Sequence, residues 1–178
     1  MPDDDRKAAF GLVADASTRL LILGSLPGAK SLALAQYYAN PGNAFWTLTG
    51  LVIGMDLRAL GYEQRLAALL AHGIGLWDVV ADAQRAGSLD SAIRAPRLRD
   101  LAAVAAGLPS LRAIAFNGST AAKLGLRQLG SAAARYMIFT LLSSSGACAV
   151  KAEVKRADWM KMQPWLMAGR SDGRKGWQ

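Results

Sequence analysis

The chain has 178 residues, 52% of them hydrophobic and 19% charged, so it is too apolar for a disordered protein and has the length of one ordinary domain. No apolar run approaches the ~18 residues of a membrane span, and the acidic first residues do not resemble a signal peptide. A single cysteine, Cys148, excludes a disulfide framework and a cysteine-ligated zinc or iron–sulfur site held by this chain alone. We therefore expect a cytoplasmic protein with no membrane partner.

The charge is unevenly distributed along the chain. Lysine and arginine number 21 against 13 aspartates and glutamates, which gives a formal net charge of +8 at pH 7. Residues 1–89 carry 7 basic and 8 acidic side chains, whereas residues 90–178 carry 14 and 5. Such a basic region favours a polyanionic partner, most commonly nucleic acid, and a generally basic surface is the alternative.

Strands and helices alternate in the predicted order of elements. They are a strand over 19–24, helices over 29–38, 43–54 and 63–71, a strand over 73–80, a helix over 98–107, a strand over 113–117, a helix over 118–124, a strand over 136–142 and a helix over 151–166. Residues 1–19 are expected to form a loose lead-in and residues 86–96 a loop. This alternation predicts an α/β fold, a three-layer α/β/α sandwich with a central, mostly parallel four-stranded sheet. We expect one domain over 1–168 and a mobile basic tail over 169–178.

In such a fold the chemistry is expected where the strands end, because ligands bind at the carboxyl ends of parallel strands. The sequence has no phosphate-loop signature, dinucleotide fingerprint or nucleophile elbow, and its only histidine, His72, precedes a strand. The polar groups at the strand ends are amides, hydroxyls and backbone. They favour recognition of a flat ligand by hydrogen bonds, without a metal or a cofactor.

Three segments together carry a family resemblance. They are GSLPG at 24–28 with QYYANPGNAFW at 36–46, AFNG at 115–118, and LLSSSGACA at 141–149. With these motifs the chain resembles the uracil-DNA glycosylase superfamily, and most closely the branch of hypoxanthine-DNA glycosylases and their uracil-excising relatives. The resemblance covers residues 19–166. It departs from the usual motifs at Leu26, where several branches have Asp or Asn, and at Leu142, Gly146 and Cys148, where Pro, Pro and Asn are usual.

The resemblance implies a pocket that holds an extruded base. Phe45 is expected to form its stacking floor, with core packing as the alternative, and Tyr38 is expected to contribute to the same pocket. Asn117 ends a strand, and its amide offers a donor beside an acceptor. Uracil and hypoxanthine present a carbonyl beside an N–H, unlike cytosine and adenine, so Asn117 can accept both deamination products. A helix N-cap is its alternative role.

Cleavage of an N-glycosidic bond needs a positioned water and stabilisation of an anionic leaving base, more than a strong base. The family motif implies that Asn43 positions the water. The alternatives are that Asn43 is only an N-cap, or that Asn40 positions the water. Backbone N–H groups near Ser25 and Leu26 are expected to hydrogen-bond the base oxygen as charge develops.

The serine-rich loop after the last strand suits phosphate contacts, which hold DNA without reading its sequence. Ser143, Ser144, Ser145 and Lys151 are the predicted phosphate ligands, with Lys155 and Arg156 extending the positive surface. An ordinary polar loop and a solvated helix face are the alternatives. Cys148 is expected to be an apolar filler.

We therefore predict a monomeric, metal-independent DNA glycosylase that starts base excision repair, with uracil as the first substrate and hypoxanthine close behind. One alternative is a non-catalytic binder of single-stranded or damaged DNA with the same fold. Another is an unrelated small α/β hydrolase that acts on nucleotides.

Overall fold

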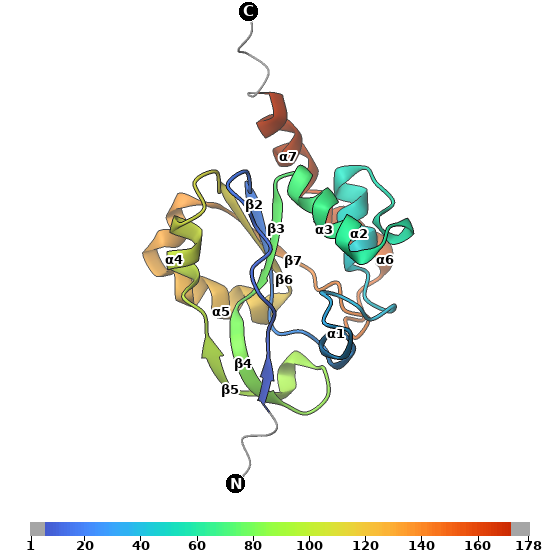
Figure 1. The fold of residues 1–178 in the computed structure, drawn as a ribbon, viewed down its shortest axis with the longest axis vertical. Coiled ribbons are helices and arrows are strands. Elements are labelled where there is room, and N and C mark those ends of the chain that lie inside the picture. The colour runs from blue at the N-terminus through green and yellow to red at the C-terminus, as the bar shows by residue number, and fades with distance from the viewer. Residues whose placement is uncertain (1–5, 172–178) are drawn as a thin grey trace, which may run out of the picture.

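The computed structural model describes residues 6–171, with a four-stranded parallel sheet at its centre (Figure 1). The strand order is β3-β2-β6-β7. These strands are β2 (Leu20–Gly24), β3 (Ile74–Asp78), β6 (Ala113–Asn117) and β7 (Met137–Leu141). The predicted α/β sandwich around a parallel four-stranded sheet is confirmed.

The side chains of β2 alternate between two helical layers, as the two-residue period of a strand requires. Leu20 and Ile22 belong to one hydrophobic cluster, and Leu21 and Leu23 to the other. The first layer is built from α2 (Phe45–Ile53), α3 (Tyr62–Ala71), α6 (Ala152–Trp159) and α7 (Met162–Ser171). The second layer is built from α4 (Leu101–Ala106) and α5 (Ser119–Leu129), on the opposite side of the sheet (Figure 1).

A second, antiparallel sheet was not predicted. It has the order β1-β4-β5, from β1 (Arg6–Ala8), β4 (Val80–Arg85) and β5 (Ile93–Leu98). Arg6 of β1 and Arg97 of β5 both form ion pairs with Asp82 of β4, at 2.5 and 2.9 Å. The predicted strand over 73–80 therefore ends at Asp78, and the predicted loop over 86–96 and lead-in over 1–19 both contain a strand. Pro96 and exposed side chains conceal β5 in the sequence, since proline is tolerated only at such sheet edges.

Two predicted helices begin or end elsewhere. The helix α1 (Ala29–Leu34) stops where Ala35 adopts a left-handed conformation with φ 50°, so the residues up to 43 form a loop. The predicted helix over 151–166 is divided between α6 and α7. Pro164 explains the division, because a proline ring clashes with the carbonyl four residues earlier, at Met160.

The remaining short elements are 3-10 turns at Leu57–Ala59, Asp90–Ala92 and Gly130–Arg135. At the C-terminal end, α7 runs to Ser171, so residues 169–171 of the predicted tail belong to a helix. Residues 172–178 lie outside the described residues. Every helix within the described range is too short or too polar to cross a membrane.

Candidate active site

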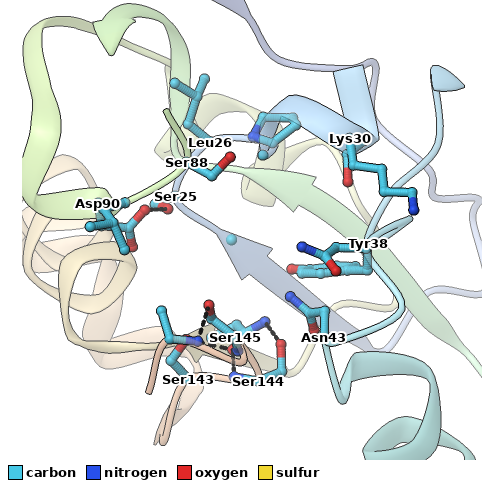
Figure 2. Close-up of a pocket in the computed structure, with 18 of the residues that line it drawn as sticks. Ser25, Leu26, Lys30, Tyr38, Asn43, Ser88, Asp90, Ser143, Ser144 and Ser145 are labelled. Atoms are coloured by element: carbon cyan, nitrogen blue, oxygen red, sulfur yellow. Dashed lines mark hydrogen bonds between the residues drawn. The ribbon is translucent and has the colours of Figure 1, made fainter. Parts of the chain in front are cut away.

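A pocket of about 330 Å³ lies at the carboxyl ends of the parallel strands (Figure 2). This volume is at the lower end of the range of small-molecule sites, which is roughly 300–1,000 Å³. The loops after β2 and β7 reach it, as does the loop between α1 and α2. The strands β3 and β6 contribute their last residues, Asp78 and Asn117. The β4–β5 loop, at 88–91, closes one side. The topology thus brings together segments that are more than one hundred residues apart in sequence.

Tyr38, and not Phe45, presents its ring to the pocket. The two rings are stacked in parallel, with centroids 3.8 Å apart and an interplanar angle of 9°. Phe45 is fully buried beneath Tyr38 and against Trp159, and it does not line the pocket. In this conformation Phe45 therefore does not reach the pocket, because Tyr38 covers the ring face that was expected to contact the base. Tyr38 adopts a left-handed φ of 53°, a conformation that a non-glycine residue holds only when its surroundings impose it.

Asn43 combines a structural and a pocket-facing role. Its Oδ1 accepts a hydrogen bond from the backbone N–H of Phe45 at 2.9 Å, at the start of α2. Ala44, and not Asn43, occupies the N-cap position, so the predicted cap is displaced by one residue. The amide nitrogen of Asn43 is turned toward the pocket (Figure 2). The side chain can therefore hold the helix start and still donate to a ligand.

Asn117 is fixed by Ser144. Its Nδ2 donates to Ser144 Oγ and its Oδ1 accepts from the Ser144 backbone N–H, both at 2.8 Å. An amide nitrogen has two N–H donors and its oxygen two lone pairs, so one donor and one acceptor site remain beyond these bonds. The remaining donor interacts with the Tyr38 hydroxyl. Asn117 is 7% exposed and lines the pocket. Its alternative role as an N-cap is not seen, since no side chain caps α5.

Ser144, one of the predicted phosphate ligands, is engaged by other residues of the protein. Its side chain is fully buried against Asn117, and its carbonyl accepts from the Ala44 N–H at 2.9 Å. Gly146 allows the same loop to approach the α1–α2 loop, because a Cβ there would lie 2.8 Å from the Gly42 carbonyl oxygen. The serine loop therefore positions Asn117 and the start of α2.

The other predicted phosphate ligands are arranged differently. Ser143 and Ser145 line the pocket, with their hydroxyls accepting backbone N–H groups within the loop. Lys151 is exposed at the start of α6, outside the pocket lining. Lys155 is buried and donates to the Ser145 carbonyl at 2.9 Å, so it supports the loop and is not part of a free positive surface. The sequence analysis missed Lys30, an exposed cation at the pocket rim (Figure 2).

Ser25 and Leu26 form the turn after β2. Ser25 Oγ donates to Asp90 Oδ1 at 2.6 Å, which ties the turn to the β4–β5 loop. The Leu26 side chain is buried in the core, so only its backbone can serve a ligand. Arg85 donates to the carbonyls of Leu26 and Pro27 and holds the turn from behind. Among the described residues, no protein acceptor engages the N–H groups of Ser25 and Leu26.

The sequence analysis also missed Asp78, an acidic residue that lines the pocket. It ends β3, is 3% exposed and lines the pocket, and its Oδ2 is buried without a hydrogen-bond partner. Its place directly after the strand motif at 74–77 was the signal that could have identified it.

Gly24 makes room for two pocket side chains that approach its backbone closely. A Cβ at this position would lie 2.6 Å from Asp78 Oδ1 and 2.9 Å from Tyr38 Oη, closer than packing allows. We expect Gly24→Ala to displace both groups and to reduce the excision rate by roughly 10- to 100-fold, since small misplacements in a site are costly. Gly11→Ala is the control, because its Cβ meets nothing within 4 Å. Single-turnover rates of the two folded variants test this, and equal rates would contradict it.

The chain is similar to known proteins in sequence. The model of the uracil DNA glycosylase superfamily matches residues 10–166. A hypoxanthine DNA glycosylase from Methanosarcina barkeri (strain Fusaro) is 38% identical over 156 residues, which cover 86% of this chain and 96% of that protein. A hypoxanthine DNA glycosylase from Methanosarcina acetivorans is 41% identical over 155 residues, with 86% and 95% covered.

A solved structure is also similar. The solution NMR structure of a candidate uracil DNA glycosylase from Methanosarcina acetivorans superposes with a TM-score of 0.79 at 39% identity, covering 91% of this chain and 99% of that one. The chain belongs to the uracil DNA glycosylase superfamily. It is a glycosylase that acts on DNA, and the family resemblance of its motifs is confirmed.

Proposed function

We propose that this glycosylase excises hypoxanthine and uracil, the deamination products of adenine and cytosine, after flipping them from the DNA stack. The observation that carries the proposal is the fixed amide of Asn117. Its second donor, which meets the Tyr38 hydroxyl in the absence of a base, and its second acceptor site match a carbonyl beside an N–H. Adenine and cytosine present the reverse pattern and would leave polar groups unpaired, which discriminates strongly. The names of the two relatives favour hypoxanthine as the better substrate, which reverses the order expected from the sequence.

The proposed reaction is hydrolysis of the bond between C1′ and the base nitrogen. The electron pair of that bond moves to the base, a water oxygen bonds to C1′, and one proton passes from the water to the medium. The pocket-facing amide nitrogen of Asn43 can position the water or the sugar. The N–H groups of Ser25 and Leu26 can stabilise negative charge on the base, as preorganised donors do in other enzymes.

A panel of oligonucleotides tests this function. Each carries hypoxanthine, uracil, xanthine, thymine, adenine or cytosine, either single-stranded or paired, and cleavage is read after alkali treatment of the abasic product. We expect hypoxanthine to react fastest, uracil next, and adenine and cytosine not at all. Binding without cleavage of any strand would instead support the non-catalytic alternative.

DNA affinity should fall steeply with salt, because phosphate neutralisation releases counterions from DNA. We expect Lys30→Gln, Lys151→Gln and Arg156→Gln each to reduce the slope of log affinity against log salt by about one, since each side chain is exposed. Lys155→Gln is the contrast: it should lower thermal stability, because Lys155 is buried on the Ser145 carbonyl. Fluorescence anisotropy over a salt series measures the slopes. An unchanged slope in all three variants would show that DNA binds elsewhere.

A further inference from the structure

Asp78 and Asn117 face each other across the pocket floor. In the sheet, β2 lies between β3 and β6, so Gly24 separates these two residues. Strands are spaced about 4.8 Å apart, which places the two backbones roughly 10 Å from each other. Gly24 adds no side chain to the space between them, and the Tyr38 hydroxyl reaches this space, 2.9 Å from where a Gly24 Cβ would lie. A base that displaces this hydroxyl would have one edge toward Asn117 and another toward Asp78.

Asp78 has no internal partner that would explain its burial. Its side chain is 3% exposed, Oδ2 is buried without a hydrogen bond, and no ion pair within 4.0 Å involves it among the described residues. A buried polar atom without a partner is destabilising, and where it lines a pocket a ligand can supply the missing bond. Both the burial and the pocket-lining position therefore indicate a ligand at Asp78.

The surroundings of Asp78 determine its protonation. The titratable and charged groups that face it come from several elements and are Tyr37, Tyr38, Arg85, Asp90 and Arg99. Burial raises the pKa of Asp78 to about 7, helped by the negative Asp90 and opposed by Arg99 and Arg85. A large share of the molecules thus carry Asp78 as a neutral acid at neutral pH. A neutral carboxylic acid can donate a hydrogen bond, which a carboxylate cannot.

We propose that Asp78 is a catalytic residue that, as a neutral acid, donates its O–H to an acceptor on the leaving base, opposite the edge read by Asn117. This rests on the proposed function. The acceptor is a bare ring nitrogen in hypoxanthine and a carbonyl oxygen in uracil. Negative charge grows on these atoms as the C1′–N bond breaks. The base leaves with the electron pair of that bond as an anion that accepts the hydrogen bond from Asp78, and the proton lost by the attacking water passes to the medium, so atoms and charges balance.

The ionised form of Asp78 would oppose the same reaction. A carboxylate facing the acceptor would repel the growing negative charge and would leave the base without a donor. The wild-type rate should therefore fall as pH rises through about 7, approaching a tenfold decrease for each further unit. An amide at this position donates at every pH and should not show that decrease.

Single-turnover rates on a hypoxanthine oligonucleotide between pH 5.5 and 8.5 test the role of Asp78. We expect Asp78→Asn to stay within about tenfold of wild type at pH 6 and to lose the decrease above pH 7. Asp78→Ala should be about 100-fold slower at low pH, as for the loss of one preorganised donor. Asp90→Asn leaves the Asp78 carboxyl group in place, so the excision rate of this variant should still decrease at high pH. A decrease that persists in Asp78→Asn, or a wild-type rate in Asp78→Ala, would overturn the proposal.

A binding measurement separates this inference from the function on which it rests. Carbon-13 NMR of the Asp78 carboxyl follows its titration with and without free hypoxanthine. Binding of the base to the neutral acid should raise the Asp78 pKa, and affinity should weaken above pH 7 in wild type but not in Asp78→Asn. If the wild-type protein cleaves no oligonucleotide but hypoxanthine still raises the Asp78 pKa, the proposed excision function is wrong and the binding of a base at Asp78 is supported. A carboxyl titration unchanged by the base overturns the site, whatever the protein cleaves.

Discussion

Asn43→Ala should slow excision by about 10²- to 10³-fold while DNA affinity stays within a few-fold of wild type. The reason is that an amide acting on the water or the developing charge contributes mainly in the transition state. Its nitrogen faces the pocket, whereas its oxygen is already engaged by the Phe45 N–H. Single-turnover kinetics with excess enzyme, together with an anisotropy titration, measures the two quantities separately.

The structural role of Asn43 requires a matched variant. Losing the bond to Phe45 should cost about 1 kcal/mol of unfolding free energy, as for other residues at helix starts. Asn43→Ser retains an oxygen that can accept from Phe45 but carries no amide into the pocket. We expect it to be as slow as Asn43→Ala and more stable. A serine variant with wild-type excision would mean that Asn43 only supports α2.

Asn117→Ala should abolish the discrimination between hypoxanthine and adenine and should also slow excision. It removes the donor and acceptor assigned to the base, and it leaves the Ser144 hydroxyl and N–H buried without their partner. We expect a rate loss above 100-fold on hypoxanthine and a loss of about 1–3 kcal/mol in unfolding free energy. Rates on hypoxanthine and adenine oligonucleotides and chemical denaturation provide the measurements.

Ser144→Ala separates the two effects of Asn117. It removes the bond from Asn117 Nδ2 to the hydroxyl but keeps the backbone bond to Oδ1, so the amide remains present but is held less firmly. Its rate should lie between those of wild type and Asn117→Ala, with the order of preferred bases unchanged. If Ser144→Ala and Asn117→Ala behave alike, loop anchoring, and not base reading, is the role of Asn117.

The parallel sheet was predictable because its signals are local. Leu20–Gly24 and Ala113–Asn117 are continuous apolar runs that end in turn residues, as strands buried on both faces do. Their alternation with amphipathic helices was sufficient to predict that helical layers cover both faces of the sheet. Parallel strands also bring their carboxyl ends to one edge of the sheet. The motif segments around Gly24, Asn43 and Asn117 could therefore be assigned to one site before their geometry was known.

The antiparallel sheet depended on contacts between distant segments. In β1, Arg6 pairs with Gln84 of β4, and Asp82 accepts from arginines of two other strands. The strand β5 carries Pro96 and mostly exposed side chains, so no apolar periodicity marks it. Strand pairing between such segments is determined by the partner strand, which a local pattern does not contain.

The motif identified which side chains meet at the pocket, but only packing determined what each one does there. The sequence analysis assigned the stacking floor to Phe45, whereas the ring stack that buries Phe45 leaves half-buried Tyr38 facing the pocket. Ser144 is indistinguishable from Ser143 and Ser145 until its hydroxyl is found on Asn117. Asp78 reads as an ordinary polar end of a strand, and its protonation follows from burial beside Asp90, Arg85 and Arg99. Local patterns encode which residues lie on a strand, a helix or a turn, whereas burial, ring contacts and pKa arise from neighbours that only the folded chain brings together.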